Sequence, residues 1–326
     1  MTPPRLLALI LFTFIFAGAL YALIGWPFGG DESSASAPPF AVEGATVTPE
    51  PKSPGATDVP HEPLAGDNCG PAADGSFMSA NQIVSYYGNP YAKQLGILGQ
   101  HEPDELASML KERAHDLDEL NGFRGVQPAF HIVYETAQPE PRENGLYLQY
   151  VDDETMQTYF DVACREGFFV FLDLQIGRSD VETEIRKVFP YLKASNVHVA
   201  IDPEFTMGPG EVPGQVIGHV DAAQINLAQQ TLEDFAVQNG LPSKILIVHQ
   251  FDEAMITDPE NIGSFPHVQV VVDMDGFGPK ETKIRKFGFF AQQAQHSGLK
   301  IFYKQDDPVM TDDEVQRLDP DVIIYQ

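Results

Sequence analysis

The segment Val197-His198-Val199-Ala200-Ile201-Asp202-Pro203-Glu204 decides the fold, because it reads as a short buried strand that turns polar where it ends. Side chains alternate between the two faces of a strand. One face of this strand is an apolar row of Val197, Val199 and Ile201. The other face runs from His198 through Ala200 to Asp202 and Glu204, so it becomes polar toward its carboxyl end.

Two other segments divide their faces in the same way. In Phe168–Leu174 the row that turns polar leads to Asp173 and Gln175, and in Val268–Asp273 it leads to Asp273 and Asp275. The interior of a (β/α)8 barrel opens into a polar mouth at the carboxyl ends of its strands, while the outer faces pack on helices. The repeated pattern predicts that these three strands belong to such a barrel.

The remainder of the chain supplies enough elements for eight strands. Besides the three above, we expect strands at Gln82–Tyr87, Pro128–Tyr134, Lys244–His249, Leu299–Tyr303 and Asp321–Tyr325. Helical patterns lie between most of them, at Pro103–Asp118, Asp153–Arg165, Val181–Pro190, Asp221–Asn239, Lys280–Ser297 and Thr311–Arg317. The connection from Gln250 to His267 shows no convincing helix. Alternation of strands and helices favours a parallel sheet, and eight strands favour a single α/β TIM-type barrel over residues 77–326.

Composition excludes several classes of protein. The 326 residues are 43% hydrophobic and 21% charged, which is ordinary for a globular chain and untypical of disorder or a multi-span membrane protein. The formal net charge is -27, with 47 acidic against 20 basic residues. Such a surface repels phosphate backbones, so no nucleic-acid partner is expected.

The amino terminus predicts attachment to a membrane. Leu6 to Trp26 carries no charge, follows Arg5, and is long enough to cross a bilayer as a helix, so we assign residues 1–26 to a transmembrane signal anchor. Cleavage after Ala17–Ala19 or Ala22 is the alternative and would give a secreted protein. Residues 27–76 are rich in Pro, Gly and Ser and predict a disordered linker. Both alternatives place the barrel outside the cytoplasm.

The two cysteines, Cys69 and Cys164, are too few for a zinc ribbon or a disulfide scaffold. Cys164 shares one side of a predicted helix with Met156, Phe160 and Ala163, which favours a buried, inert thiol. A Cys69–Cys164 bridge outside the cell is the alternative, since spacing alone does not decide between them.

The polar strand ends predict the site. We expect Asp202, Glu204, Asp273 and Asp275 to be the catalytic candidates. The substrate-binding candidates are Tyr86, Tyr87, His131, Asp173, Gln175, His249, Gln250, Tyr303, Lys304, Asp306 and Tyr325. Mixed aromatic rings and carboxylates suit a sugar, and neighbouring carboxylates push each other's pKa values apart, so that one can donate a proton while another stays anionic.

Structural explanations compete with these roles. A single acid at a strand end commonly caps the turn that follows, and Asp202-Pro203 is a typical turn former. We expect His198, deeper in the same row, to be a core histidine. For His249, at the end of its strand, a functional role and a structural role are equally well supported. No P-loop, His-x-His, His-Glu-x-x-His or Gly-x-Ser-x-Gly motif occurs, which argues against nucleotide phosphate binding, a zinc hydrolase and a serine esterase.

The strand end Ala200-Ile201-Asp202-Pro203-Glu204 resembles the Asp-x-Glu strand end of family 18 chitinases and family 25 lysozymes, and Ser85-Tyr86-Tyr87-Gly88 is similar to the first strand of chitinase-type barrels. The resemblance implies a (β/α)8 glycosidase with Glu204 as acid and Asp202 as its assisting carboxylate. The further chitinase aspartates are replaced by Val197 and Ala200. The globular part also resembles uncharacterised secreted or lipid-anchored bacterial proteins with similar Tyr-Tyr-Gly, Leu-Asp-x-Gln and terminal Tyr-Gln segments. This second resemblance does not point to any particular activity.

These patterns together predict a membrane-tethered, extracytoplasmic glycoside hydrolase that acts on a cell-envelope or environmental polysaccharide by carboxylate acid/base catalysis. A non-catalytic glycan-binding barrel and a cation-dependent hydrolase are the alternatives. No cofactor is expected from a motif. A Ca²⁺ or Mg²⁺ ion among the acids would belong to the last alternative.

Overall fold

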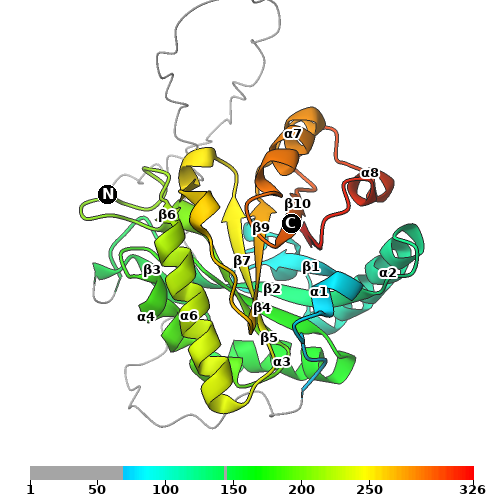
Figure 1. Ribbon diagram of the computed structural model, residues 1–326, viewed down its shortest axis with the longest axis horizontal. Helices are drawn as coiled ribbons and strands as arrows, with labels where there is room; N and C mark the ends of the chain where they lie inside the picture. Colours follow the sequence, from blue (N-terminus) through cyan, green and yellow to red (C-terminus); the bar gives the residue numbers. More distant parts are fainter. Residues whose placement is uncertain (1–68, 143–144) are drawn as a thin grey trace, which may run out of the picture. The chain divides into compact units, whose positions relative to one another are not determined.

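Eight parallel strands close into a barrel in the computed structural model, which describes residues 69–142 and 145–326 (Figure 1). Their order is β1-β11-β10-β9-β7-β5-β4-β2, and β1 pairs in turn with β2, which completes the circle. The strands are β1 (Gln82–Gly88), β2 (Val126–Ala137), β4 (Phe169–Leu174), β5 (Val197–Ile201), β7 (Lys244–Gln250), β9 (Val268–Met274), β10 (His296–Ile301) and β11 (Val322–Tyr325). The α/β barrel predicted from the sequence is therefore confirmed.

Helices follow most barrel strands and cover the outside of the barrel. They are α2 (Pro103–Leu120), α3 (Asp153–Glu166), α4 (Val181–Lys187), α5 (Phe189–Leu192), α6 (Ala222–Asn239), α7 (Lys280–Phe290) and α8 (Asp312–Gln316). Several begin where a side chain accepts a backbone N–H: Asp152 for α3, Asp180 for α4, and capping boxes at Asp221 and Thr311 for α6 and α8. Gly167 and Gly240 end α3 and α6 in the left-handed conformation, which glycine adopts without strain.

Small elements complete the connections. A short strand β3 (Leu148–Tyr150) pairs antiparallel with the end of β2, and β6 (Val220–Asp221) pairs with β8 (Ile256–Thr257) in a separate two-stranded sheet. The β7–β9 connection holds β8 and two 3-10 turns, η5 (Glu253–Met255) and η6 (Pro259–Asn261). The absence of an α-helix between Gln250 and His267, expected from the sequence, is confirmed.

Two expected boundaries were wrong. The helix predicted over Lys280–Ser297 ends at Phe290, and β10 begins at His296, where the sequence placed a strand from Leu299. Pairing explains the difference, because His296 and Gly298 lie opposite Val271 and Asp273 of β9 and barrel closure needs those residues extended. The helix predicted over Val181–Pro190 divides into α4 and α5 at Val188.

The two faces of each strand separate as expected. Outward residues such as Val199, Leu172 and Val270 belong to the large apolar cluster shared with the helices. A second apolar cluster, which includes Ala200 and Phe171, fills the barrel interior. The interior is therefore packed at its amino-terminal end and leaves its polar residues at the other end.

The segment before β1 closes the floor of the barrel. Ala73 and Met78 are buried in the interior cluster, and the ring of Phe77 packs on Phe169 with centroids 5.0 Å apart. Gln269, near the start of β9, donates to the Asp74 carbonyl (3.0 Å) and accepts from the Met78 N–H (3.3 Å). Helix α1 (Phe77–Ala80) leads from this floor into β1.

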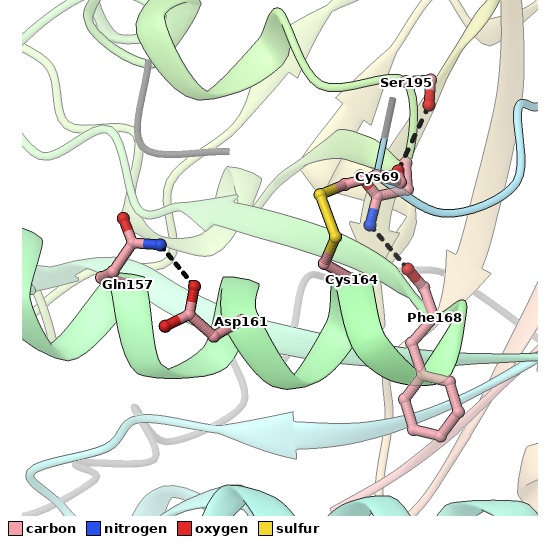
Figure 2. Close-up of a disulfide and its surroundings, with 7 residues drawn as sticks. Cys69, Gln157, Asp161, Cys164, Phe168 and Ser195 are labelled. Carbon is pink, nitrogen blue, oxygen red and sulfur yellow. Dashed lines mark hydrogen bonds between the residues drawn. A yellow bond between two sulfur atoms is a disulfide. The ribbon is translucent and has the colours of Figure 1, made fainter. Parts of the chain in front are cut away.

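A disulfide joins this segment to α3 (Figure 2). Cys69 and Cys164 are bonded, with Cα atoms 4.7 Å apart, and Ser195 Oγ donates to the Cys69 carbonyl (3.3 Å). The inert thiol favoured by the sequence is therefore wrong. Cys164 does lie on a helix, α3, as predicted. Its partner Cys69 is 95 residues away in the sequence, so only the folded position of that segment shows that the two cysteines meet.

The predicted anchor over residues 1–26 lies outside the described residues, as does the predicted linker up to residue 68. In the portion of the chain that the structure describes, no helix combines the length and the apolar character needed to cross a bilayer.

Candidate functional site

The carboxyl ends of the strands bring a cluster of ionisable side chains into the upper barrel. Among the predicted residues, Asp173 lies on β4, Asp202 and Glu204 follow β5, His249 lies on β7, Asp273 lies on β9 and Asp275 follows it. Tyr87 on β1 and His131 on β2, also predicted, join this cluster, and the structure adds Lys300 from β10. Apart from Glu204, which is half-buried, all of these side chains are almost completely buried.

His249 lies at the centre of this cluster. Its Nδ1 donates to Asp273 Oδ2 at 2.9 Å and lies 3.6 Å from Asp275 Oδ2. Its Nε2 lies 3.6 Å from Asp173 Oδ2, an ion-pair contact that is too long for a hydrogen bond. Three carboxylates from two strands thus surround one imidazole.

His131 lies on the other side of Asp173, with Nε2 3.9 Å from Asp173 Oδ2. Its ring stacks on Phe171 at a centroid distance of 5.4 Å and lies 5.3 Å from the ring of His249. Within the described residues neither nitrogen of His131 has a hydrogen-bond partner. The sequence placed His131 at the rim, whereas the structure places it inside the barrel.

Lys300 is the functional candidate that the sequence reasoning missed. Its Nζ lies 3.0 Å from Asp275 Oδ1 and sits over the Tyr87 ring, 3.4 Å from the centroid. The lysine is 2% exposed, so its ammonium group interacts with Asp275 and the aromatic face and not with solvent. A lysine inside an otherwise apolar strand was the available signal.

Gly298, opposite Asp273 in the next strand, makes room for the carboxylate. A Cβ at this position would lie 2.6 Å from Asp273 Oδ1. The absence of a side chain at Gly298 therefore lets Asp273 reach His249.

Asp202 and Glu204 differ in their surroundings, since Asp202 caps a turn and Glu204 is partly exposed. Asp202 is buried, and its Oδ1 accepts the N–H of Glu204 at 3.2 Å, which caps the 3-10 turn η4 (Pro203–Phe205). Burial, and next the charge of Glu204, raise the pKa of Asp202 well above its ordinary value. Asp202 thus fixes the backbone that carries Glu204, as the capping explanation proposed.

The pKa of Glu204 lies above its ordinary value. Burial and then the charge of Asp275 raise the pKa of Glu204 to about 7, against the opposing charge of Lys300. Burial also raises the pKa of Asp275, again opposed by Lys300. The two carboxyl groups titrate as an interacting pair, in which one proton can be held near neutral pH.

Deeper in the barrel, the pKa values of Asp173, His131 and His249 are shifted away from their ordinary values. Burial alone would raise the pKa of Asp173, but the positive charge of His249, helped by that of Lys300, outweighs it and lowers that pKa to about 2. Burial lowers the pKa of His131 well below its ordinary value. Burial also opposes a charge on His249, yet Asp173 and Asp273 raise the pKa of His249 well above the ordinary value.

Two glutamines near these strand ends make backbone contacts. Gln175 Oε1 accepts the N–H of Ala137 (2.8 Å), and Gln250 donates to the carbonyl of Asp252 (3.2 Å). Both side chains are buried, and these contacts hold the loops that leave β2 and β7.

The structure brings three predicted aromatic residues together elsewhere. Tyr86 and Tyr325 face the helix layer, with ring centroids 6.4 Å apart, and Tyr303 stacks on Tyr325 at 5.5 Å. Arg113 of α2 lies over Tyr325, whose hydroxyl donates to Asp312 (2.7 Å). Parity along β1 explains this, since Tyr86 and Tyr87 must point to opposite faces.

The other two predicted residues of the β10–β11 connection also lie apart from the His249 cluster. Asp306 is an ion-pair partner of Lys283 (3.0 Å) and accepts the N–H of Phe302 (2.9 Å). Lys304 is exposed and, with Tyr303 and Gln326, lines a small hollow of about 90 Å³.

His198 behaves as the core histidine that the sequence indicated. It is buried against Phe169 and Phe171, and its Nδ1 accepts the N–H of Ile245 (3.3 Å). Among the described residues no carboxylate forms an ion pair or a hydrogen bond with this ring, which separates it from His131 and His249.

Comparisons with known proteins give similarity at the level of solved structures alone, since no family model and no curated protein matches this chain. Oxaloacetate acetylhydrolase in complex with oxalate is similar at a TM-score of 0.42 and 12% identity over 81% of each chain. Cellulase Cel5C_n is similar at a TM-score of 0.43 and 12% identity, over 76% of this chain and 75% of the cellulase. PbGH5A, a glycoside hydrolase family 5 enzyme from Prevotella bryantii B14, is similar at a TM-score of 0.41 and 10% identity, over 78% of this chain and 90% of that enzyme. No residue role is carried over from these proteins.

Proposed function

We propose that the barrel is a hydrolase that acts on a glycan, with Glu204 as the proton donor and Asp275 as the neighbouring carboxylate. The observation that carries this proposal is the raised pKa of Glu204, about 7, beside Asp275 at the mouth of the barrel. A carboxylic acid that still holds its proton near neutral pH can protonate a leaving-group oxygen.

The surroundings of Glu204 favour an acid/base pair over a purely structural one. Glu204 is half-buried, so a substrate can reach it, whereas the capping contact at η4 belongs to Asp202. Asp275 keeps Lys300 at 3.0 Å and can stabilise positive charge that develops on a sugar ring or orient a water. Asp273 acts through His249 and is a positioning residue.

A glycan is the substrate class that the rim favours. Phe277 follows Asp275 by two residues and exposes 49% of its surface, and its ring packs edge-on against Phe302 at 5.7 Å. An exposed flat ring next to carboxylates suits the apolar face and the hydroxyls of a pyranose. The Asp-x-Glu resemblance of Asp202-Pro203-Glu204 agrees with a glycosidase.

Glu204→Gln separates an enzyme from a glycan-binding barrel. Release of reducing ends is measured on a panel of polysaccharides built from neutral and N-acetylated sugars. We expect the variant to lose about 10²–10⁴-fold in turnover and to keep its binding to the insoluble substrate. The control is Glu119→Gln, whose exposed side chain lies in the last turn of α2. A wild-type protein that binds glycan without any turnover would establish the binding alternative.

We also infer that the barrel works outside the cytoplasm, tethered by the predicted anchor or released from it. The Cys69–Cys164 disulfide supports this, because structural disulfides persist in oxidising compartments. Alkylation of cells before lysis should leave both cysteines unmodified, and rapid labelling of both thiols would contradict the inference.

A further inference from the structure

Three buried donor atoms converge below the Glu204–Asp275 pair. They are Nε2 of His131, Oδ2 of Asp173 and Nε2 of His249, contributed by three different strands. Asp173 Oδ2 lies 3.9 Å from the first nitrogen and 3.6 Å from the second, and all three atoms lie within 4.8 Å of one another. All three side chains are 0% exposed.

The hydrogen bonding of His249 leaves its Nε2 available. Asp273 Oδ2 accepts a hydrogen bond from Nδ1 at 2.9 Å, so Nδ1 is engaged and Nε2 is the nitrogen left for a further partner. Nε2 points toward Asp173 and His131, and it offers its lone pair to a metal ion once that ion displaces its proton. A carboxylate that fixes the tautomer of a histidine from behind is the usual support of a metal-ligating imidazole.

The donors are also left without other partners. Within the described residues, no hydrogen bond reaches either nitrogen of His131, either oxygen of Asp173 or Nε2 of His249. Buried polar atoms are normally paired, since an unpaired one costs roughly 1–3 kcal/mol. Three of these five atoms, one from each side chain, are the converging donors, so a single shared partner would satisfy all three.

The charge balance asks for a cation. Asp173, Asp273 and Asp275 are buried close together around His249, and Lys300 is engaged by Asp275, so a proton on His249 is the other nearby positive charge. Buried carboxylates require compensation by positive charge or metal. A divalent cation held between Asp173 and the two imidazoles would supply this positive charge in place of the proton on His249.

The distances suit a small transition-metal ion. Two ligands about 2.1 Å from a tetrahedral zinc ion lie about 3.4 Å apart, so small side-chain adjustments would bring the 3.6 Å and 3.9 Å separations to that value. Two imidazoles and one carboxylate are a typical zinc donor set, whereas Ca²⁺ and Mg²⁺ prefer oxygen ligands. The overlapping group of His249, Asp273 and Asp275 is less suited, because the first two are bonded to each other and Asp275 holds Lys300.

We propose that His131, Asp173 and His249 form a binding site for one zinc-class divalent cation, oriented by Asp273 behind His249. Three protein ligands leave a fourth position for water or a substrate atom. The proposal does not depend on the glycan-hydrolase function, since its ligands are distinct from Glu204 and Asp275.

The test uses the full chain, unfolded in urea with a chelator and refolded with or without Zn²⁺, because the donors are closed off from solvent. Metal content after desalting and the Tm are measured. We expect one tightly held zinc per chain and a higher Tm with zinc. Ca²⁺ or Mg²⁺ at the same concentration should give neither result.

Asp173→Asn and His131→Asn test the ligands, and His198→Asn is the matched control. His198 is an equally buried histidine of the same interior, bonded to a backbone N–H instead of facing a carboxylate. The two ligand variants should bind zinc at least about 100-fold more weakly, and Asp273→Ala about 10–100-fold more weakly. His198→Asn should keep the stoichiometric zinc.

Two outcomes would overturn the site. The first is a wild-type chain that retains no zinc and shows no change in Tm. The second is zinc bound equally by wild type and by Asp173→Asn, which keeps the volume of the side chain and tests the proposal even if His131→Asn does not fold. Either result would leave His249 and Asp173 as a buried ion pair.

Discussion

At the scale of single residues, Glu204 links the site to stability. Its folded pKa of about 7 lies above its ordinary value of 4.5, because burial and Asp275 disfavour the anion. The folded state therefore holds this proton where the unfolded chain has lost it, and the contribution of Glu204 to stability falls as pH rises through this window. Glu204→Gln cannot ionise and escapes this loss.

We expect the free energy of unfolding of Glu204→Gln, relative to wild type, to increase between about pH 4.5 and pH 7 and to level off above. Urea denaturation at half-unit steps from pH 4 to pH 8 measures it. The exposed Glu119→Gln variant is the control, because its side chain is in water in both states. A constant difference across this range would contradict a raised pKa at Glu204.

Gly298 gives a second prediction at this scale. In Gly298→Ala the new methyl group would lie 2.6 Å from Asp273 Oδ1 and must displace the carboxylate that holds His249. Overpacking of this kind costs about 1–3 kcal/mol of unfolding free energy. Gly288→Ala in α7 is the matched control, since its Cβ meets nothing within 4 Å and alanine favours a helix. Equal stability of the two variants would show that Asp273 moves without cost.

The period-two pattern predicted part of this site and could not predict the rest. It identified Asp173, Asp202 and Asp273 as interior residues from one strand each. Lys300 was missed although it lies in the expected strand Leu299–Tyr303, because its face of that strand runs from Lys300 to Phe302 and so does not turn polar toward the carboxyl end. Tyr86 was placed at the mouth by proximity to Tyr87, although strand parity sends it to the helix layer.

At the scale of elements, the disulfide determines how firmly the floor segment is held. The bond closes a loop between residues 95 apart, and the cross-link restricts the unfolded chain. We expect the Cys69→Ser, Cys164→Ser double variant to lose about 2–4 kcal/mol of unfolding free energy, measured by urea denaturation. Wild type treated with reductant should move to the same midpoint. A double variant as stable as the oxidised protein would show that the floor contacts of Phe77 and Met78 hold the segment alone.

The elements themselves were predictable where local signals agree. Asp152 and Asp221 cap helices that also have a clear apolar face, and both helices begin within one residue of the expected position. The end of α7 was not predictable, because nothing local stops a helix at Phe290. The strand that follows is imposed by β9, across which Gly298 must lie opposite Asp273.

At the scale of the whole molecule, the barrel has two unlike ends. The floor is sealed by Ala73 and Met78 and fastened by the disulfide, whereas the other end gathers the ionisable groups. The proposed site therefore opens toward the Glu204 side of the barrel and not toward the floor. This division follows from parallel strands, which place all carboxyl ends on one face.

The charge of the whole chain leads to the last prediction. With 47 acidic and 20 basic residues, the folded surface repels itself, and unfolding relieves part of that repulsion by spreading the charges. Screening shortens the range of this repulsion from about 30 Å at 0.01 M to about 8 Å at 0.15 M salt. We expect the urea midpoint of the full chain, in a non-ionic detergent buffer, to rise between 0.01 M and 0.15 M NaCl. KCl should act equally, because screening depends on ionic strength and not on the identity of the cation. A midpoint that falls with salt would mean that attractive pairs such as Arg113–Asp312 outweigh the net repulsion.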